Sequence, residues 1–172
     1  MESWQPTRET IDQVRDAVLL AGRLEHLRVH QTARTEFFSI IAFALGGTLD
    51  GVDAFVSQDP DDTSGEHRVY WLRGNSFGSL ALKAHNGPEG ANEPAEVSGY
   101  VRSLHEIAHV EIVGATAEWP FSGGFPTVHP DVKIHFDNGD AVTISATARS
   151  HDGARKQVAM FVEKLLEAVA RR

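Results

Sequence analysis

Residues 104–119, LHEIAHVEIVGATAEW, decide how this chain is interpreted, because they fit two incompatible structures. As an α-helix, they would place His105 and His109 on one face with Glu106 beside them, which is the H-E-x-x-H pattern of zinc peptidases. As a β-strand, the same residues would lie within a sheet and bring no ligands to a common metal. The two structures predict different proteins: a small zinc-dependent metallopeptidase or a binding module.

The sequence on both sides of the motif favours the strand. Upstream, VSGYVRSL contains Ser98-Gly99 together with β-branched and aromatic residues, all of which disfavour a helix. Downstream, VEIVGATAEW alternates with the period of a strand, and Gly114 and Thr116 weaken a helix further. We therefore predict that the segment is a hinge between two strands. Its structurally important residues would be Leu104, Ile107, Val110 and Ile112.

A catalytic zinc site also needs a third protein ligand. The extended metzincin pattern requires glycine and histidine where this chain has Ile112 and Ala115. After Glu118, no glutamate occurs until Glu163. The remaining candidates for a third ligand are His129, Asp131 and His135. The favoured interpretation assigns no catalytic residue, no metal ligand and no cofactor. The alternative assigns zinc to His105 and His109 and makes Glu106 the base.

Helical periodicity is present at both ends of the chain. Apolar residues recur at three- and four-residue steps over 7–33, where Thr7 is a suitable N-cap, and again over 152–170. Residues 35–45, TEFFSIIAFAL, predict a buried helix that ends at Gly46-Gly47, with a core strand as the alternative. The sequence therefore predicts N-terminal helices and one C-terminal helix.

Strand periodicity fills the region between these helices. The predicted strands cover 53–57, 67–73, 77–85 and 97–104, and a hairpin covers 132–148 with Asn138-Gly139 as a type I′ turn. Residues 58–66 form an acidic loop with proline and glycine. Asp59, Asp61 and Asp62 in this loop lack the spacing and the terminal glutamate of a calcium loop, so a solvated loop is the favoured interpretation.

Composition excludes several classes of partner. The 172 residues carry a formal net charge of −8, with 24 acidic against 16 basic side chains, and contain no cysteine. The basic side chains are scattered, which disfavours nucleic acid and anionic lipid. The start of the chain lacks the features of a signal peptide, and the longest apolar run, 37–45, is too short to span a bilayer. We expect a cytoplasmic protein without stable membrane association.

Four aromatic residues suggest a second kind of site. Trp71, Trp119, Phe121 and Phe125 could line an apolar pocket, although aromatic residues in sheets are more often part of the core. We therefore expect these four aromatic residues to belong to the core.

The order of the elements from 67 onward resembles the pleckstrin-homology superfold. VRSLHEIAHVEIVG is similar to the bacterial PH-like pattern in which one strand turns into the next, and VKIHFDNGDAVTIS is similar to its sixth and seventh strands. The resemblance covers 67–172 and implies an antiparallel, seven-stranded bent barrel closed by the C-terminal helix. It leaves 1–50 as an N-terminal helical segment and 51–66 as an acidic linker. The loop 74–76 has only Arg73 and Lys83 nearby, so lipid-headgroup binding is not implied.

These observations predict an α+β protein. The expected function is that of a non-enzymatic binding or scaffold module that recognises a protein or peptide through a sheet edge or the groove beside the C-terminal helix. A homodimer through the same edge or through the N-terminal helices is also compatible with the sequence. The alternative is the zinc-dependent peptidase.

Overall fold

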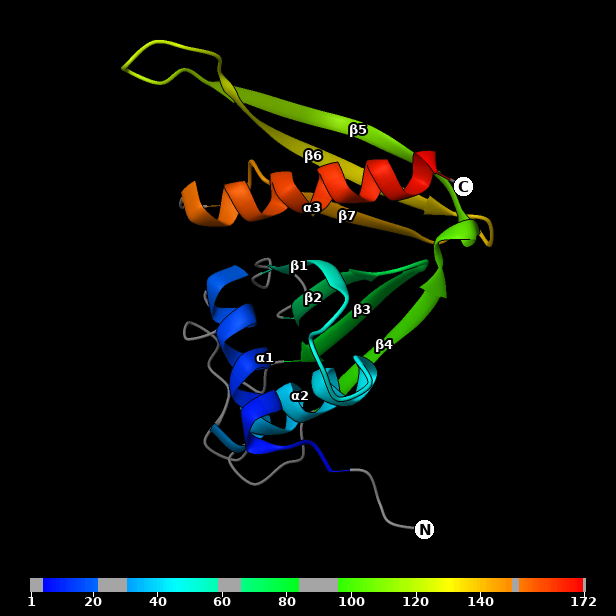
Figure 1. Ribbon diagram of the computed structural model, residues 1–172. Coiled ribbons are helices and arrows are strands. Elements are labelled where there is room, and N and C mark those ends of the chain that lie inside the picture. The colour runs from blue at the N-terminus through cyan, green and yellow to red at the C-terminus, as the bar shows by residue number, and fades with distance from the viewer. Residues whose placement is uncertain (1–4, 22–30, 59–65, 84–95, 150–151, 172) are drawn as a thin grey trace.

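The computed structural model of this chain describes residues 5–21, 31–58, 66–83, 96–149 and 152–171. These residues form an α+β fold, as expected from the sequence, and their strands make two separate antiparallel sheets (Figure 1). The helices are α1 (Arg8–Ala21), α2 (Gln31–Ala44) and α3 (Asp152–Ala170), with one 3-10 turn, η3 (Leu104–Glu106). The strands are β1 (Val52–Gln58), β2 (Glu66–Arg73), β3 (Ser76–Lys83), β4 (Glu96–Ser103), β5 (Ile107–Glu118), β6 (Thr127–Phe136) and β7 (Ala141–Ser145).

The four-stranded sheet, sheet A, is covered on both faces over its central strands β2 and β3, whose residues alternate between two apolar cores. In β2, Tyr70 and Leu72 face sheet B and α3, whereas Val69 and Trp71 face α1 and α2. Figure 1 shows sheet A between the N-terminal helices on one side and α3 with sheet B on the other. Antiparallel sheets commonly leave one face to solvent. Here the near-continuous apolar run VYWL supplies both faces.

The three-stranded sheet, sheet B, has the order β5-β6-β7. Its inner face carries Val132, Ile134 and Ile144, which have no exposed surface. Helix α3 packs against β1 of sheet A and β6 of sheet B, and Phe161 and Leu165 fill the space between them. The hairpin predicted over 132–148 and the helix predicted over 152–170 are confirmed.

The N-terminal helices differ in part from their predicted bounds. Thr7 caps α1, since its Oγ1 accepts a hydrogen bond from the Thr10 amide at 3.1 Å. Residues 31–33, which the periodicity assigned to the end of the first helix, belong to α2 instead. Helix α2 includes residues 35–44, so the helix predicted over 35–45 is formed except at its last residue, and the alternative of a core strand is wrong. Gly46 and Gly47 end this helix with positive φ angles of 71° and 84°.

The turn of the β6–β7 hairpin corrects a second prediction. A type I′ turn needs positive φ at both central residues, yet no described residue other than glycine has a positive φ. Instead, the Gly139 amide donates to the Phe136 carbonyl at 2.9 Å, and Gly139 alone is left-handed, with φ 89°. This is the three-residue loop in which a type I turn is followed by a glycine bulge. Asn138 therefore keeps an ordinary backbone conformation.

The seven strands do not close into a barrel, contrary to the expectation. Sheets A and B remain separate, and η3 joins them between β4 and β5. The strand expected at 53–57 is β1, which pairs with β2 along its length and so makes part of 51–66 a member of sheet A. Asp59, Asp61 and Asp62 lie outside the described residues. None of the described helices combines the length and apolar character needed to cross a bilayer.

Candidate functional site

The HEIAH motif is divided between two elements. His105 and Glu106 lie in η3, and His109 lies in the strand β5, so no α-helical turn presents both imidazoles on one face. Glu106 has a local role, because its Oε1 accepts a hydrogen bond from the Ser103 amide at 3.1 Å and completes a capping box. The predicted hinge between two strands is therefore confirmed, and the geometry required of a zinc peptidase is not formed.

The hydrophobic residues of this segment follow the prediction at three positions out of four. Leu104 and Ile107 are buried, and Val110 packs against the core cluster between the sheets. Ile112 is 62% exposed. The difference arises because Ile112 lines an open groove between the β5–β6 hairpin and α3, where no side chain fills the space over it.

The strand register brings His109 together with two residues outside the motif, Glu111 on the same strand and His135 on β6. His135 of β6 is directly opposite His109, and the two rings stack with centroids 4.2 Å apart. The Nε2 atom of His135 lies 3.0 Å from Oε2 of Glu111. His109, Glu111 and His135 form a group whose donor atoms all lie within 4.8 Å of one another. His105 is not part of this group.

The other two candidate ligands have structural contacts. Asp131 accepts hydrogen bonds from the Ser145 hydroxyl at 2.7 Å and the Thr147 amide at 2.9 Å. Burial favours a higher pKa for Asp131, but the hydrogen bonds from Thr147 and Ser145 outweigh it and leave the pKa lowered. His129 is buried, with Nε2 3.3 Å from Oε2 of Glu118. Neither residue belongs to the group formed by His109, Glu111 and His135.

A buried serine–histidine pair also occurs, in the core beside α2. Ser57 Oγ and His67 Nε2 lie 2.6 Å apart, and neither residue has exposed surface. Burial, with a smaller contribution from the charge of Arg149, lowers the pKa of His67 to about 3. The pair resembles a nucleophile and its base in distance alone. Because no substrate can reach it, its role is structural.

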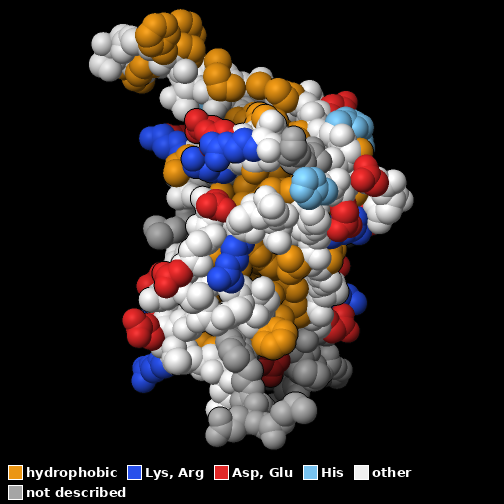
Figure 2. All heavy atoms as spheres, turned by 45° about the vertical axis from the view of Figure 1, so that its right-hand side comes forward, with side chains coloured by type: hydrophobic (Ala, Val, Ile, Leu, Met, Phe, Trp, Pro, Cys, Tyr) orange, Lys and Arg blue, Asp and Glu red, His pale blue; other side chains and the backbone are white. Residues whose placement is uncertain are grey.

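The most prominent surface feature is the outer part of the β5–β6 hairpin, which projects beyond the two sheets (Figure 1). We call residues 113–128 the arm. Its tip carries Trp119, Phe121 and Phe125, which are 68%, 113% and 93% exposed. Figure 2 shows hydrophobic side chains gathered on this projection at the top of the molecule. Trp71 lies in the core as expected, but the other three aromatic residues belong neither to the core nor to a pocket.

An apolar groove lies at the base of the arm, between the β5–β6 hairpin and α3. Its volume is about 660 Å³. Met160 and Leu166 form its α3 wall and are 59% and 39% exposed, and Ile112 and Val128 form its strand wall. Lys156 and Glu163 are the charged residues that line it. The arm and the groove share Thr127 and Val128, so exposed apolar side chains lie on adjacent parts of one hairpin. Exposed apolar patches mark interaction sites in soluble proteins.

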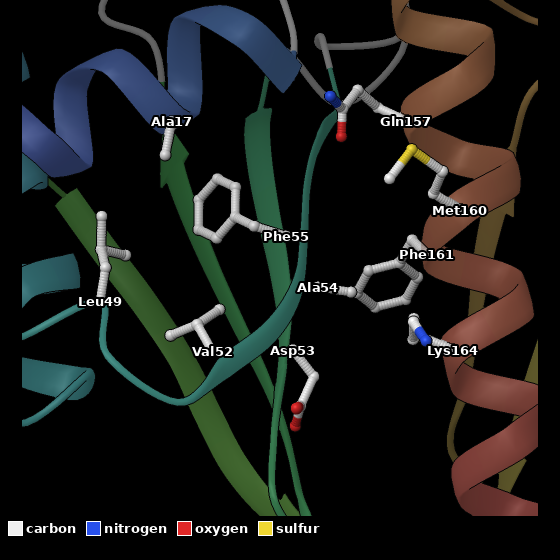
Figure 3. Close-up of a pocket in the computed structure, with 10 residues that line it drawn as sticks. All are labelled: Ala17, Leu49, Val52, Asp53, Ala54, Phe55, Gln157, Met160, Phe161 and Lys164. Atoms are coloured by element: carbon white, nitrogen blue, oxygen red, sulfur yellow. The ribbon is translucent and has the colours of Figure 1, made fainter.

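A smaller cavity of about 340 Å³ lies where α1, β1 and α3 meet. Figure 3 shows Phe55 of β1 and Phe161 of α3 on either side of it, with Ala17 of α1 nearby. Asp53 is also at its wall, but its Oδ2 accepts a hydrogen bond from the Gly74 amide at 2.9 Å. The cavity thus offers space for a small apolar group but few polar atoms to orient a substrate.

Comparison of the chain with family models, with curated proteins and with solved structures found no match. Sequence reasoning missed Glu111 and the groove residues of α3. The signal for Glu111 was present, since it alternates with Val110 and Ile112 on the same strand as His109 and thus shares the face of His109.

Proposed function

We propose that this protein is a non-enzymatic binding module, and that the arm and the groove beside α3 recognise an apolar segment of another polypeptide. The observation that carries this proposal is the high exposure of the arm-tip aromatics on a hairpin that also lines an apolar groove. Exposed tryptophan and phenylalanine are costly in water, and such residues are typical of the centres of protein interfaces.

The edge of β5 supports the same proposal. Among the described strands, β5 pairs only with β6, so its other edge is open over a strand of twelve residues. An open edge of this length is a template for another strand unless it is covered. Because Ile112 of β5 also lines the groove, a segment added to this edge would place alternate side chains in the groove.

The remaining parts of the proposal rest on the sequence. Kinship with the PH superfold rests on the resemblance of VRSLHEIAHVEIVG and VKIHFDNGDAVTIS to strands of that superfold. A cytoplasmic location is supported by the absence of cysteine. A peptidase function gains no support from the divided HEIAH motif, and fold alone does not define a function.

The arm is tested by a triple variant, Trp119→Ser/Phe121→Ser/Phe125→Ser, and the groove by Met160→Glu. The matched control is Phe43→Ser, since Phe43 is a 64% exposed aromatic residue on α2, which lies on the opposite side of sheet A from the arm. Affinity purification of the tagged full chain from its native cells, with quantitative mass spectrometry, measures the bound proteins. We expect both site variants to reduce the enrichment of a partner by at least about tenfold, since interface aromatics contribute about 2 kcal/mol or more each.

Light scattering on the purified chain distinguishes a second copy from a different protein. If the partner is another copy, the wild type and Phe43→Ser will have the mass of an oligomer, and the arm variant that of a monomer. The proposal would be overturned if all four chains were monomeric and enriched the same proteins as a tag-only control. The melting temperatures of the arm variant and the wild type should agree, because the substituted side chains make no core contacts.

A further inference from the structure

We infer that His109, Glu111 and His135, on the outer face of sheet B, form a binding site for a divalent transition-metal ion of the zinc class. This site is independent of the proposed polypeptide binding. It uses one histidine of the HEIAH motif, but its other two ligands come from the strand geometry and not from the motif.

The register of sheet B places the three side chains on one face. His109 and His135 are direct partners across the β5–β6 ladder, and Glu111 is two residues further along β5. Side chains at positions i and i+2 of a strand point to the same side. The residues between them, Val110 and Ile134, point to the core, so the outer position of the three ligands is fixed by the burial of their neighbours.

The spacing suits a metal ion after small side-chain rotations. Zinc binds imidazole nitrogen and carboxylate oxygen at about 2.0–2.2 Å, so tetrahedral donors lie about 3.4 Å apart. In the structure the donor atoms of the three side chains lie within 4.8 Å of one another, which is about 1.4 Å more than this tetrahedral spacing. His109 and Glu111 are exposed and His135 is half-buried, so the side chains have room to rotate while the strands stay in place.

The donor chemistry determines the class of metal. Two imidazoles and one carboxylate suit zinc and neighbouring transition metals, whereas magnesium and calcium prefer sites made wholly of oxygen. Three protein donors leave the fourth tetrahedral position to water or to an external group. Lys133 is opposite Glu111 in the ladder, and its positive charge opposes the binding of a cation.

Isothermal titration of zinc chloride into the chelator-treated full chain tests the site. The variants are His135→Ala and the matched control His105→Ala, which removes the exposed histidine of HEIAH that lies outside the group. We expect one zinc ion per chain, and a zinc affinity that falls by at least about tenfold in His135→Ala. Substitution of a residue that only hydrogen-bonds to a metal ligand already lowers metal affinity by about that factor. His105→Ala should bind as the wild type does.

A second variant guards against loss of fold. Lys133→Gln keeps all three ligands and should bind zinc more tightly than the wild type, since an opposing charge is removed. Melting curves without metal establish that each variant is folded. The inference is overturned if the wild type binds no zinc, or if His105→Ala loses binding while His135→Ala retains it. The latter result would assign the metal to the HEIAH motif instead.

Discussion

At the scale of single residues, the packing of Trp71 on Gly78 is a defining contact of sheet A. The two residues are partners across β2 and β3. A Cβ atom added at Gly78 would lie 1.9 Å from the Trp71 indole, far inside van der Waals contact. The glycine is therefore required by the space that the ring occupies, and not by its own backbone conformation.

We predict that Gly78→Ala lowers the free energy of unfolding by about 1–3 kcal/mol, the usual cost of overpacking a core. Urea denaturation measures the change. In a Trp71→Leu background the same substitution should cost less, because the smaller side chain leaves room for the methyl group. Equal costs in both backgrounds would show that the ring contact is not the cause.

The Ser57–His67 pair predicts a pH dependence of stability. The pKa of His67 falls from 6.5 to about 3 on burial, so the unfolded chain binds a proton that the folded chain excludes. The contribution of His67 to the free energy of unfolding is therefore fully present above pH 6.5 and is lost as the pH falls toward 3. From pH 7 to pH 5 we expect a loss of about 2 kcal/mol, at roughly 1.4 kcal/mol per pH unit below 6.5.

Urea denaturation at the two pH values measures this loss. The variant Ser57→Ala/His67→Leu removes the titrating group together with its partner, so that no hydroxyl is left buried without its hydrogen bond. Its stability should change less between pH 7 and pH 5 than that of the wild type. An unchanged difference would assign the pH dependence to other groups.

At the scale of elements, Arg102 joins the end of β4 to the β6–β7 turn and so connects the two sheets. Its guanidinium lies 4.4 Å from the centroid of the Tyr100 ring and 4.6 Å from that of Phe136. It also pairs with Asp140 and donates to Asn138 Oδ1 at 3.2 Å. Asp140 is exposed, and exposed ion pairs contribute about 0–1 kcal/mol, so the stacking on two rings is the larger part of the interaction.

We predict that Arg102→Ala lowers the free energy of unfolding by about 1–3 kcal/mol and that Asp140→Asn lowers it by less than about 1 kcal/mol. Arg102→Lys should recover only part of the loss, because lysine lacks the broad delocalised guanidinium that contacts both rings. Denaturation at low and high salt tests the cause. A loss in Arg102→Ala that disappears at high salt would identify the ion pair as the main contribution.

At the scale of the whole molecule, sheet A is the common wall of two cores. One core lies against α1 and α2, and the other lies against α3 and sheet B. The arm contributes no residue to either core; it faces α3 across the groove and pairs with it through Glu118 and Arg155, whose charged atoms lie 3.8 Å apart. The buried residues that stabilise the protein therefore lie in the two cores and not in the arm. This leaves the arm, the groove and the outer face of sheet B available for binding.

Local sequence predicts the structures that depend on near neighbours: the α3 helix, the strand pairs predicted over 67–85 and 132–148, which correspond to β2–β3 and to β6–β7, and the strand conformation of His109. Periodicity and turn residues encode these directly, since their hydrogen bonds join residues close in sequence or aligned by a short turn. The tertiary structure alone decided that His135 lies opposite His109, that Ile112 and the arm-tip aromatics are exposed, and that the sheets remain open. These outcomes depend on where one element ends relative to another. An alternating pattern defines two faces of a strand but does not state what covers either face.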